Sequence, residues 1–239
     1  MYMRQDAIAL VIPAWNEAEA LRQLLPEIPE KLVQWVIVVD NKSTDETASV
    51  AAAAGAVVVR EEQRGYGRAC WRGFQAAREL GAEIVVFIDG DGSDNPVDLP
   101  AMVAPILANE ADFVIGSRVG KQAEAGAVPP QARLGNWLIS RMVSQIYHVH
   151  VHDIGSFRAV RIQVLESLQM QEMTFGWPVE MLVKMARGRY RILEIPLHYR
   201  RRSHGHSKVS GTITGSVRAA YAMLSTMARY ARKKDLKYV

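Results

Sequence analysis

Two aspartates one residue apart, Asp89 and Asp91, are the residues in this chain best suited to chemistry. They stand at the end of the apolar run 84–89, just beyond the hydrophobic part of an expected strand. Paired carboxylates supply the oxygen ligands that hard divalent cations prefer, and bound Mg²⁺ or Mn²⁺ can neutralise charge on a diphosphate. We therefore expect Asp89 and Asp91 to hold a divalent metal ion.

Two other interpretations compete for the same pair of aspartates. An EF-hand calcium loop that began at Asp89 would need Gly at its sixth position and Glu at its twelfth. Asp94 and Pro100 occupy those positions, which excludes such a loop. The remaining alternative is a turn in which an aspartate caps the next helix.

Candidate site residues, most of them polar, also follow three other apolar runs. They are Pro13, Asn16 and Glu17 after the run 8–12, Asp40 and Asn41 at the end of the run 35–40, and Arg118 after the run 113–116. A carboxylate in the position of Asp40 commonly contacts the base or the ribose hydroxyls of a nucleotide. Helix capping is again the alternative role.

The elements that must position these residues alternate regularly in the first half of the chain. The expected strands are 8–12, 35–40, 56–59, 84–89 and 113–116, and the expected helices between them are 18–32, 44–55, 66–81 and 97–109. Repeated strand–helix units predict an α/β fold with a mostly parallel central sheet flanked by helices. Ligands of such sheets bind at the carboxyl ends of the strands, where the polar residues stand.

The second half of the chain is less regular. We expect a mobile loop over 120–130, a helix over 131–147, a strand over 154–160, a helix over 178–187, a strand over 192–199, a loop over 200–210 and an amphipathic helix from Ser216 onward. His148, His150 and His152 alternate with valines, so on a strand they would share one face. A zinc site there is disfavoured, because three ligands from one strand rarely converge on one ion.

Composition and charge narrow the class of protein. With 49% hydrophobic and 23% charged residues, the 239-residue chain is typical of a globular protein. No apolar run reaches the roughly 18 residues of a membrane-spanning helix, and no signal-peptide pattern opens the sequence. Its single cysteine, Cys70, cannot form an internal disulfide. We therefore expect a cytoplasmic protein.

Positive charge gathers at the C-terminal end. Residues 200–239 hold ten Lys or Arg and one acidic residue, which indicates an anionic partner such as a membrane surface or a phosphorylated substrate. No nucleic-acid-binding motif is present, so we expect no nucleic acid partner. The glycine fingerprint of dinucleotide-binding enzymes is also absent, which disfavours hydride transfer.

Taken together, eight segments in order resemble the family-2 glycosyltransferases, and among them the dolichyl-phosphate mannose synthase-like, polyprenyl-phosphate branch. They are Val11–Glu17, Val38–Asp45, Arg64–Ala69, Phe87–Asp91, Gly116–Arg118, Asp153–Arg158, Gly176–Glu180 and Arg202–Lys208. The resemblance implies a GT-A, Rossmann-like catalytic domain over 1–210. Its nucleotide-binding half would cover about 1–118 and its acceptor half about 119–210, with a basic amphipathic C-terminal helix over 211–239.

The resemblance also assigns roles to residues. Pro13, Asn16, Glu17, Asp40 and Asn41 would bind the nucleoside of a nucleotide-diphosphate sugar of the GDP-mannose or UDP-hexose type. Asp89 and Asp91 would bind Mg²⁺ or Mn²⁺ and the diphosphate. Arg118, Arg133, Arg202 and Lys208 would bind phosphate groups of donor and acceptor, for which Arg and Lys are suited. Ser93 stands where the mannose synthases have a Gln at the metal.

The implied reaction is a single inverting displacement that transfers a sugar to an acceptor. A lipid phosphate acceptor needs no strong base, whereas a hydroxyl acceptor needs a carboxylate, for which Asp153 and Glu180 are the candidates. The C-terminal helix would lie on the membrane surface or pack on protein. The alternatives are a soluble hydroxyl acceptor, a nucleotidyltransferase and a non-catalytic nucleotide-sugar-binding module. The sequence leaves the sugar, the base and the oligomeric state open.

Overall fold

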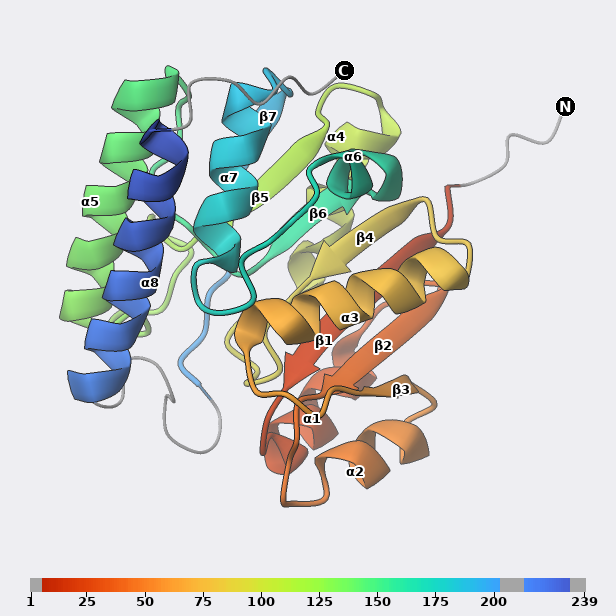
Figure 1. The fold of residues 1–239 in the computed structure, drawn as a ribbon. Helices are drawn as coiled ribbons and strands as arrows, with labels where there is room; N and C mark the ends of the chain where they lie inside the picture. The colour runs from red at the N-terminus through yellow and green to blue at the C-terminus, as the bar shows by residue number, and fades with distance from the viewer. Residues whose placement is uncertain (1–5, 203–212, 233–239) are drawn as a thin grey trace, which may run out of the picture.

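A seven-stranded sheet forms the centre of the computed structural model, which describes residues 6–202 and 213–232 (Figure 1). The strand order is β3-β2-β1-β4-β6-β5-β7. Their bounds are β1 Ile8–Ala14, β2 Trp35–Asp40, β3 Val57–Arg60, β4 Ile84–Phe87, β5 Phe113–Ser117, β6 Arg158–Arg161 and β7 Ile192–Pro196. Only β6 runs antiparallel to its neighbours, so the other six strands end at one edge of the sheet.

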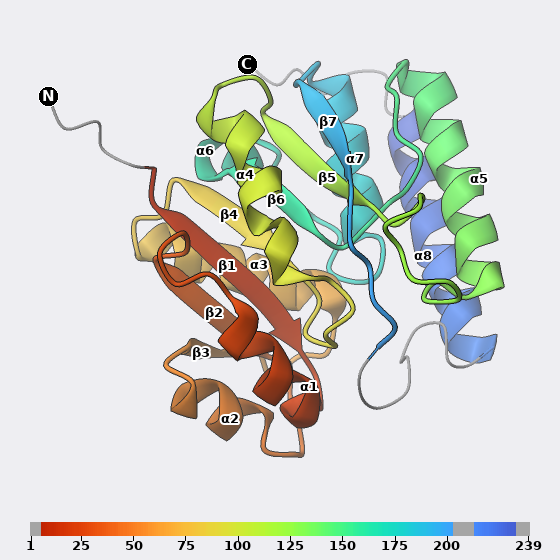
Figure 2. The same cartoon turned by 180° about the vertical axis from the view of Figure 1, so that it is seen from behind.

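Helices cover both faces of the sheet. Helices α3 (Tyr66–Glu79) and α7 (Trp177–Arg187) lie on the face seen in Figure 1, and α1 (Ala18–Leu24) and α4 (Leu99–Leu107) lie on the face seen in Figure 2. The short helix α2 (Thr47–Ala53) packs on α1 and β3, and α6 (Ile162–Ser167) follows β6. Buried residues of β1 alternate between the two cores, with Val11 on the α3 side and Leu10 on the α1 side. This two-sided burial explains the continuous apolar runs of the sequence.

Two long helices stand beside α7 at the β7 end of the molecule. They are α5 (Pro130–Tyr147) and α8 (Ile213–Arg232), which contact each other and α7 (Figures 1 and 2). Among the described residues, no helix is both long and apolar enough to cross a membrane.

The predicted α/β architecture with a mostly parallel sheet is confirmed, and the differences are local. The first helix ends at Leu24 and a 3-10 turn, Leu25–Glu27, contains Pro26. The expected strand 154–160 begins only at Arg158, because residues 153–157 form a loop at the carboxyl edge. The last strand ends at Pro196, and a further hydrogen bond, from Leu197 N to Ser117 O (2.9 Å), follows it.

The histidines do not lie on a strand, so the condition under which they would share one face is not met. His148 takes a left-handed backbone conformation after α5, with φ of 55°, and residues 149–152 are irregular. All three histidine side chains are exposed. Within the described ranges, no group of three or more His, Cys, Asp or Glu residues is arranged to hold a metal. A zinc site at these histidines therefore has no structural support.

The N-terminus of α3 packs directly against the backbone of residues 172–174. Gly67 N donates to Thr174 O (3.2 Å), and Arg68 N donates to Met173 O (3.1 Å). A Cβ on Gly67 would lie 2.5 Å from Glu172 O, a backbone atom that cannot turn aside. This close approach requires glycine and fixes the entry of the 61–66 loop into α3.

The glycine contact predicts a matched pair of stability changes. Gly67→Ala is expected to lower the free energy of unfolding by about 1–3 kcal/mol, because the new methyl overlaps the 172–173 backbone. Gly135→Ala, in α5, meets nothing within 4 Å and is expected to raise it by about 0.5–1 kcal/mol. Urea unfolding of both variants measures the two changes. An equal loss of unfolding free energy in both would contradict the close packing of α3 on residues 172–174.

Candidate active site

Three carboxylates, not two, gather beyond the end of β4. The Asp89 backbone N–H donates to Asp94 Oδ2 (3.0 Å), which also accepts from Ser156 Oγ (2.9 Å). Asp91 Oδ1 accepts from the backbone N and the Oγ of Ser93, at 2.9 and 2.5 Å. Asp94 is buried, with 1% of its surface exposed. Sequence reasoning missed Asp94 as a site residue, although its position three residues after Asp91 was a signal.

The electrostatics of this group favour a cation. Burial and the neighbouring charge of Asp91 raise the pKa of Asp89 to about 6. Burial and the charge of Asp89 raise the pKa of Asp94 to about 8. Asp94 Oδ1 is buried without a hydrogen-bond partner. The raised pKa values show that these carboxylates lack compensating positive charge, which a divalent cation would supply. Asp89 and Asp91 fit Mg²⁺ or Mn²⁺, which commonly take one or two carboxylates plus substrate phosphate oxygens.

The ends of β1 and β2 are joined by their polar residues. Thr44 N donates to Asn16 Oδ1 (2.8 Å), and Asn16 N donates to Ser43 Oγ (3.0 Å). Asn16 adopts a positive φ of 53°, so it works partly as a turn residue. Asp40 Oδ1 accepts from Ser43 N at 2.9 Å. The local turn role that competed with nucleotide contact is thus present at Asp40.

Asn41 holds a neighbouring loop. Its Oδ1 accepts from Gly65 N (2.9 Å), and its Nδ2 donates to Glu61 O (3.2 Å) and Gln63 O (2.8 Å). The Arg64 guanidinium lies 3.4 Å from the centre of the Trp15 ring. Asn41 therefore uses its amide to shape the 61–65 loop beside Pro13 and Asp40, and sequence reasoning did not anticipate that role.

Arg202 connects the acidic end of β4 with the end of β1. Its Nη2 lies 2.7 Å from Asp91 Oδ2, and its Nη1 lies 3.2 Å from Glu17 Oε1. The structure thus brings together three residues from the start, middle and end of the chain. Lys208, the other cation expected from that segment, lies outside the described residues.

Arg118 and Asp153 form a two-pronged ion pair at the same edge. Arg118 Nε and Nη2 donate to the two Asp153 oxygens at 2.7 and 2.8 Å, and Arg118 N donates to Oδ2 at 2.8 Å. Burial would raise the pKa of Asp153, but the charge and hydrogen bonds of Arg118 outweigh it and hold that pKa below its usual range. Asp153 therefore orients Arg118, and its depressed pKa makes it a poor proton acceptor.

A cleft of about 1110 Å³ opens beside this ion pair. Arg118 and Asp153 line one part of it, and the α5 side chains of Arg133, Trp137 and Arg141 line another. The three arginines of the lining outnumber its two acidic residues, Glu124 and Asp153, and this excess of positive charge suits an anionic ligand.

Glu180 lies elsewhere, inside the α7–α8 contact. It is 0% exposed, and its carboxylate accepts from Gln171 N (3.0 Å), Glu172 N (2.6 Å) and the Tyr230 hydroxyl. Lys184 Nζ is 2.8 Å from Glu180 Oε1. The idea that Glu180 is a catalytic base therefore receives no support, since its oxygens are enclosed by these donors. Its observed role is to anchor α8 and the 171–172 backbone.

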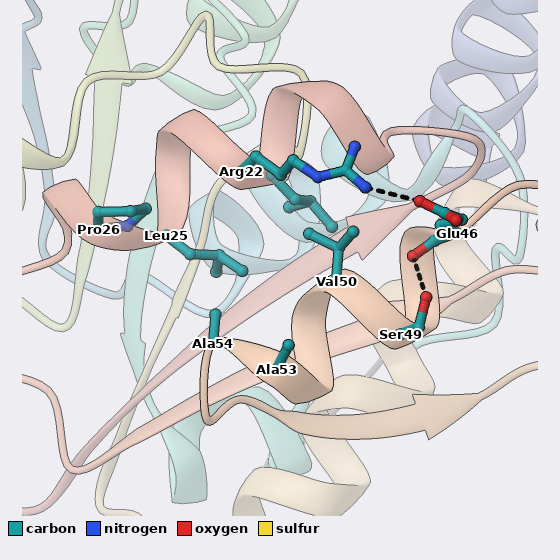
Figure 3. Close-up of a pocket in the computed structure, with 9 residues that line it drawn as sticks. Arg22, Leu25, Pro26, Glu46, Ser49, Val50, Ala53 and Ala54 are labelled. Atoms are coloured by element: carbon teal, nitrogen blue, oxygen red, sulfur yellow. Dashed lines mark hydrogen bonds and ion pairs between the residues drawn. The ribbon is translucent and has the colours of Figure 1, made fainter.

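A second hollow, of about 500 Å³, lies between α1 and α2 (Figure 3). Leu25, Pro26 and Val50 line it, and the Arg22–Glu46 ion pair crosses its rim at 2.6 Å. None of the acidic or phosphate-binding candidates lines this groove. The candidate site residues therefore lie at the strand-end edge and not in this groove.

Known proteins share both the sequence pattern and the fold. Residues 9–169 match the family model described as glycosyl transferase family 2. An uncharacterised glycosyltransferase of Mycobacterium tuberculosis is 40% identical over 90% of this chain and 95% of its own length. Undecaprenyl-phosphate mannosyltransferase of Micrococcus luteus is 30% identical over 87% of this chain and 89% of its own.

One solved structure extends the likeness to the fold. Glucosyl-3-phosphoglycerate synthase of Mycobacterium tuberculosis, crystallised with Mn²⁺, UDP and glucosyl-3-phosphoglycerate, matches with a TM-score of 0.74 at 24% identity. The match covers 96% of this chain and 81% of the synthase chain. The family match and the 30% identity with the Micrococcus luteus mannosyltransferase agree with the resemblance drawn from the eight segments. The chain belongs to glycosyl transferase family 2 and is a glycosyltransferase with the GT-A fold.

Proposed function

We propose that this enzyme transfers a hexose from a nucleotide-diphosphate sugar to a polyprenyl phosphate by a metal-dependent, inverting displacement. The observation that carries the proposal is the juxtaposition of an acidic pair and an arginine-lined cleft at one edge of the sheet. Asp89 and Asp91 lie at the end of β4, and Arg118 at the end of β5 faces the cleft. The first suits a metal–diphosphate, and the second suits an anionic acceptor.

The donor half rests on the ends of β1, β2 and β4. Pro13, Glu17 and Asp40 would contact the nucleoside, with Asn16 and Asn41 shaping the surrounding loops. A divalent cation held by Asp89 and Asp91 supplies the charge that stabilises the departing nucleoside diphosphate. The role of Asp94 is to fix the Asp89 backbone through the 3.0 Å hydrogen bond from its N–H. The crystallised relative with Mn²⁺ and UDP supports this assignment.

The acceptor half rests on Arg118, Arg133 and the cleft. Asp153 is committed to Arg118 and Glu180 is enclosed between α7 and α8, so neither carboxylate is placed to take a proton from a hydroxyl. A phosphate acceptor, already an anion near neutral pH, needs no such base. The Micrococcus luteus relative is named for action on undecaprenyl phosphate, which supports a lipid acceptor.

A second candidate acceptor is a small soluble molecule that carries a negative charge. The glucosyl-3-phosphoglycerate synthase supports this alternative, because it has the same fold and its acceptor is phosphoglyceric acid. An arginine-lined cleft would serve either acceptor. The presence or absence of a lipid chain separates the two functions.

A membrane contact through α5 and α8 would bring a lipid acceptor to the cleft. Neither helix contains an acidic residue. Leu134 and Trp137 on α5 are 65% and 53% exposed, and Tyr221 on α8 is 74% exposed. Exposed apolar and aromatic side chains without acidic neighbours are typical of helices that lie in a membrane interface. On this basis we propose that the enzyme contacts a membrane surface, which for an enzyme that uses a nucleotide sugar would be the cytoplasmic face.

The donor assignment predicts a metal-dependent ligand effect. A UDP- or GDP-sugar added with Mn²⁺ is expected to raise the free energy of unfolding by about 2.7 kcal/mol when the free sugar nucleotide is at a hundred times its Kd. Asp91→Asn should lose the metal-dependent part of this thermal shift. The control is Asp112→Asn, which removes a carboxylate paired with Arg191 at the opposite edge of the sheet. A shift that survives in Asp91→Asn would contradict the metal site.

The acceptor assignment predicts a selective loss of turnover. Arg118→Gln is expected to lower the rate of nucleoside-diphosphate release with undecaprenyl phosphate by about a hundredfold, since a charged hydrogen bond contributes about 1.5–3 kcal/mol. Donor affinity should stay near the wild-type value. Arg22→Gln, on the α1–α2 groove, is the matched control. Turnover with 3-phosphoglycerate and none with the lipid would favour the soluble-acceptor function.

The membrane assignment predicts binding to anionic vesicles. The wild-type protein should float with vesicles containing phosphatidylglycerol at low salt and bind less at high salt. Trp137→Ser combined with Leu134→Ser should reduce flotation. Val97→Ser, at a site that is 63% exposed and lies just before α4, serves as control. Absence of flotation in the wild-type protein would exclude this surface as a membrane contact.

A further inference from the structure

Arg202 occupies the place where the metal and the diphosphate would meet. One of its terminal nitrogens is 2.7 Å from Asp91 Oδ2, and the other is 3.2 Å from Glu17 Oε1. The Arg202 side chain is 21% exposed, and those of Asp91 and Glu17 are 14% and 9% exposed. Its guanidinium thus lies between the metal-binding end of β4 and the nucleoside-binding end of β1, in a partly desolvated position.

Both oxygens of Asp91 are engaged in this arrangement. Oδ1 accepts from the Ser93 backbone N and Oγ, and Oδ2 pairs with Arg202. A dication on Asp91 would come within a few ångströms of the guanidinium, where like charges repel strongly because screening by water is reduced. Metal binding at Asp91 and the Arg202–Asp91 ion pair therefore oppose each other.

The other arginines near this edge have partners of their own. Arg118 is held by Asp153, Arg200 pairs with Glu27 at 2.8 Å, and Arg201 donates to Ala125 O at 2.6 Å. In the part of the chain that the structure describes, Arg202 is the arginine that ion-pairs directly with a metal-binding carboxylate. It is therefore a residue whose position must change when a cation binds Asp91.

We propose that Arg202 is an exchangeable counter-ion: it pairs with Asp91 when the metal is absent and transfers to the donor diphosphate when metal and nucleotide bind together. This inference rests on the proposed function and adds a coupling between the binding of the metal and the binding of the donor. Metal alone must displace Arg202 from Asp91 with no new anion for the guanidinium to meet. Metal with a nucleoside diphosphate supplies that anion, so Arg202 makes the two ligands bind cooperatively.

If Arg202 exchanges Asp91 for the diphosphate, the affinity of the protein for Mn²⁺ reports the exchange directly. Mn²⁺ binding is measured by the electron paramagnetic resonance signal of free Mn²⁺, first with Mn²⁺ alone and then with UDP or GDP added. Arg202→Gln is expected to bind Mn²⁺ alone about tenfold more tightly than the wild type, because the opposing charge is gone. The same variant should lose most of the gain in Mn²⁺ affinity that the nucleoside diphosphate gives the wild type.

Matched variants make each outcome decisive. Arg202→Met is a second neutral variant and should behave as Arg202→Gln, whereas Arg202→Lys keeps the charge and should retain weak binding of Mn²⁺ alone. Arg200→Gln, two residues away and paired with Glu27, should match the wild type. Melting curves of all variants confirm that each is folded before its affinity is compared.

Two failures are distinguishable. If Asp91→Asn abolishes Mn²⁺ binding but the neutral Arg202 variants bind Mn²⁺ alone no more tightly than the wild type, the counter-ion role is wrong and the metal site stands. If Asp91→Asn binds Mn²⁺ as the wild type does, with and without nucleotide, the metal site itself is wrong, and the counter-ion role falls with it.

Discussion

The parallel direction of the strands is the constraint on which the rest of the structure depends. Six of the seven strands end at one edge, so the polar residues that follow β1, β2, β4 and β5 converge although they are far apart in sequence. The antiparallel strand β6 contributes to the same edge from its beginning. Its preceding loop brings Asp153 to Arg118 and Ser156 to Asp94.

Charge balance is the second organising force at this edge. Burial raises the pKa of Asp89 and Asp94, which means that the acidic cluster is short of compensating charge. Arg202 supplies one positive charge to Asp91, while Arg118 is committed to Asp153. The two ion pairs divide the edge into an acidic side at Asp91 and a basic side at the cleft beside Arg118, which is the separation that the proposed transfer between two anionic substrates would require.

The 171–174 segment links helices α7 and α8 to the start of α3. Glu180 accepts hydrogen bonds from Gln171 N, Glu172 N and Tyr230, and so joins α7 and α8 to this segment. The same segment accepts from Gly67 N and Arg68 N at the start of α3. A buried carboxylate with this many donors stabilises a specific arrangement of backbone, which gives Glu180 a structural role.

The sequence by itself determined the fold class, the family and which polar residues follow the ends of the strands. Apolar runs that end in polar residues reveal buried parallel strands and their carboxyl ends, and spacing such as Asp89-Gly-Asp91 is local information. Tertiary structure alone decided which residues pair. Asp153 and Glu180 have the same chemistry in sequence, yet one orients Arg118 and the other lies between α7 and α8. The partners of a side chain depend on contacts between distant segments, such as Arg202 with Asp91 and Glu17, and no local pattern specifies them.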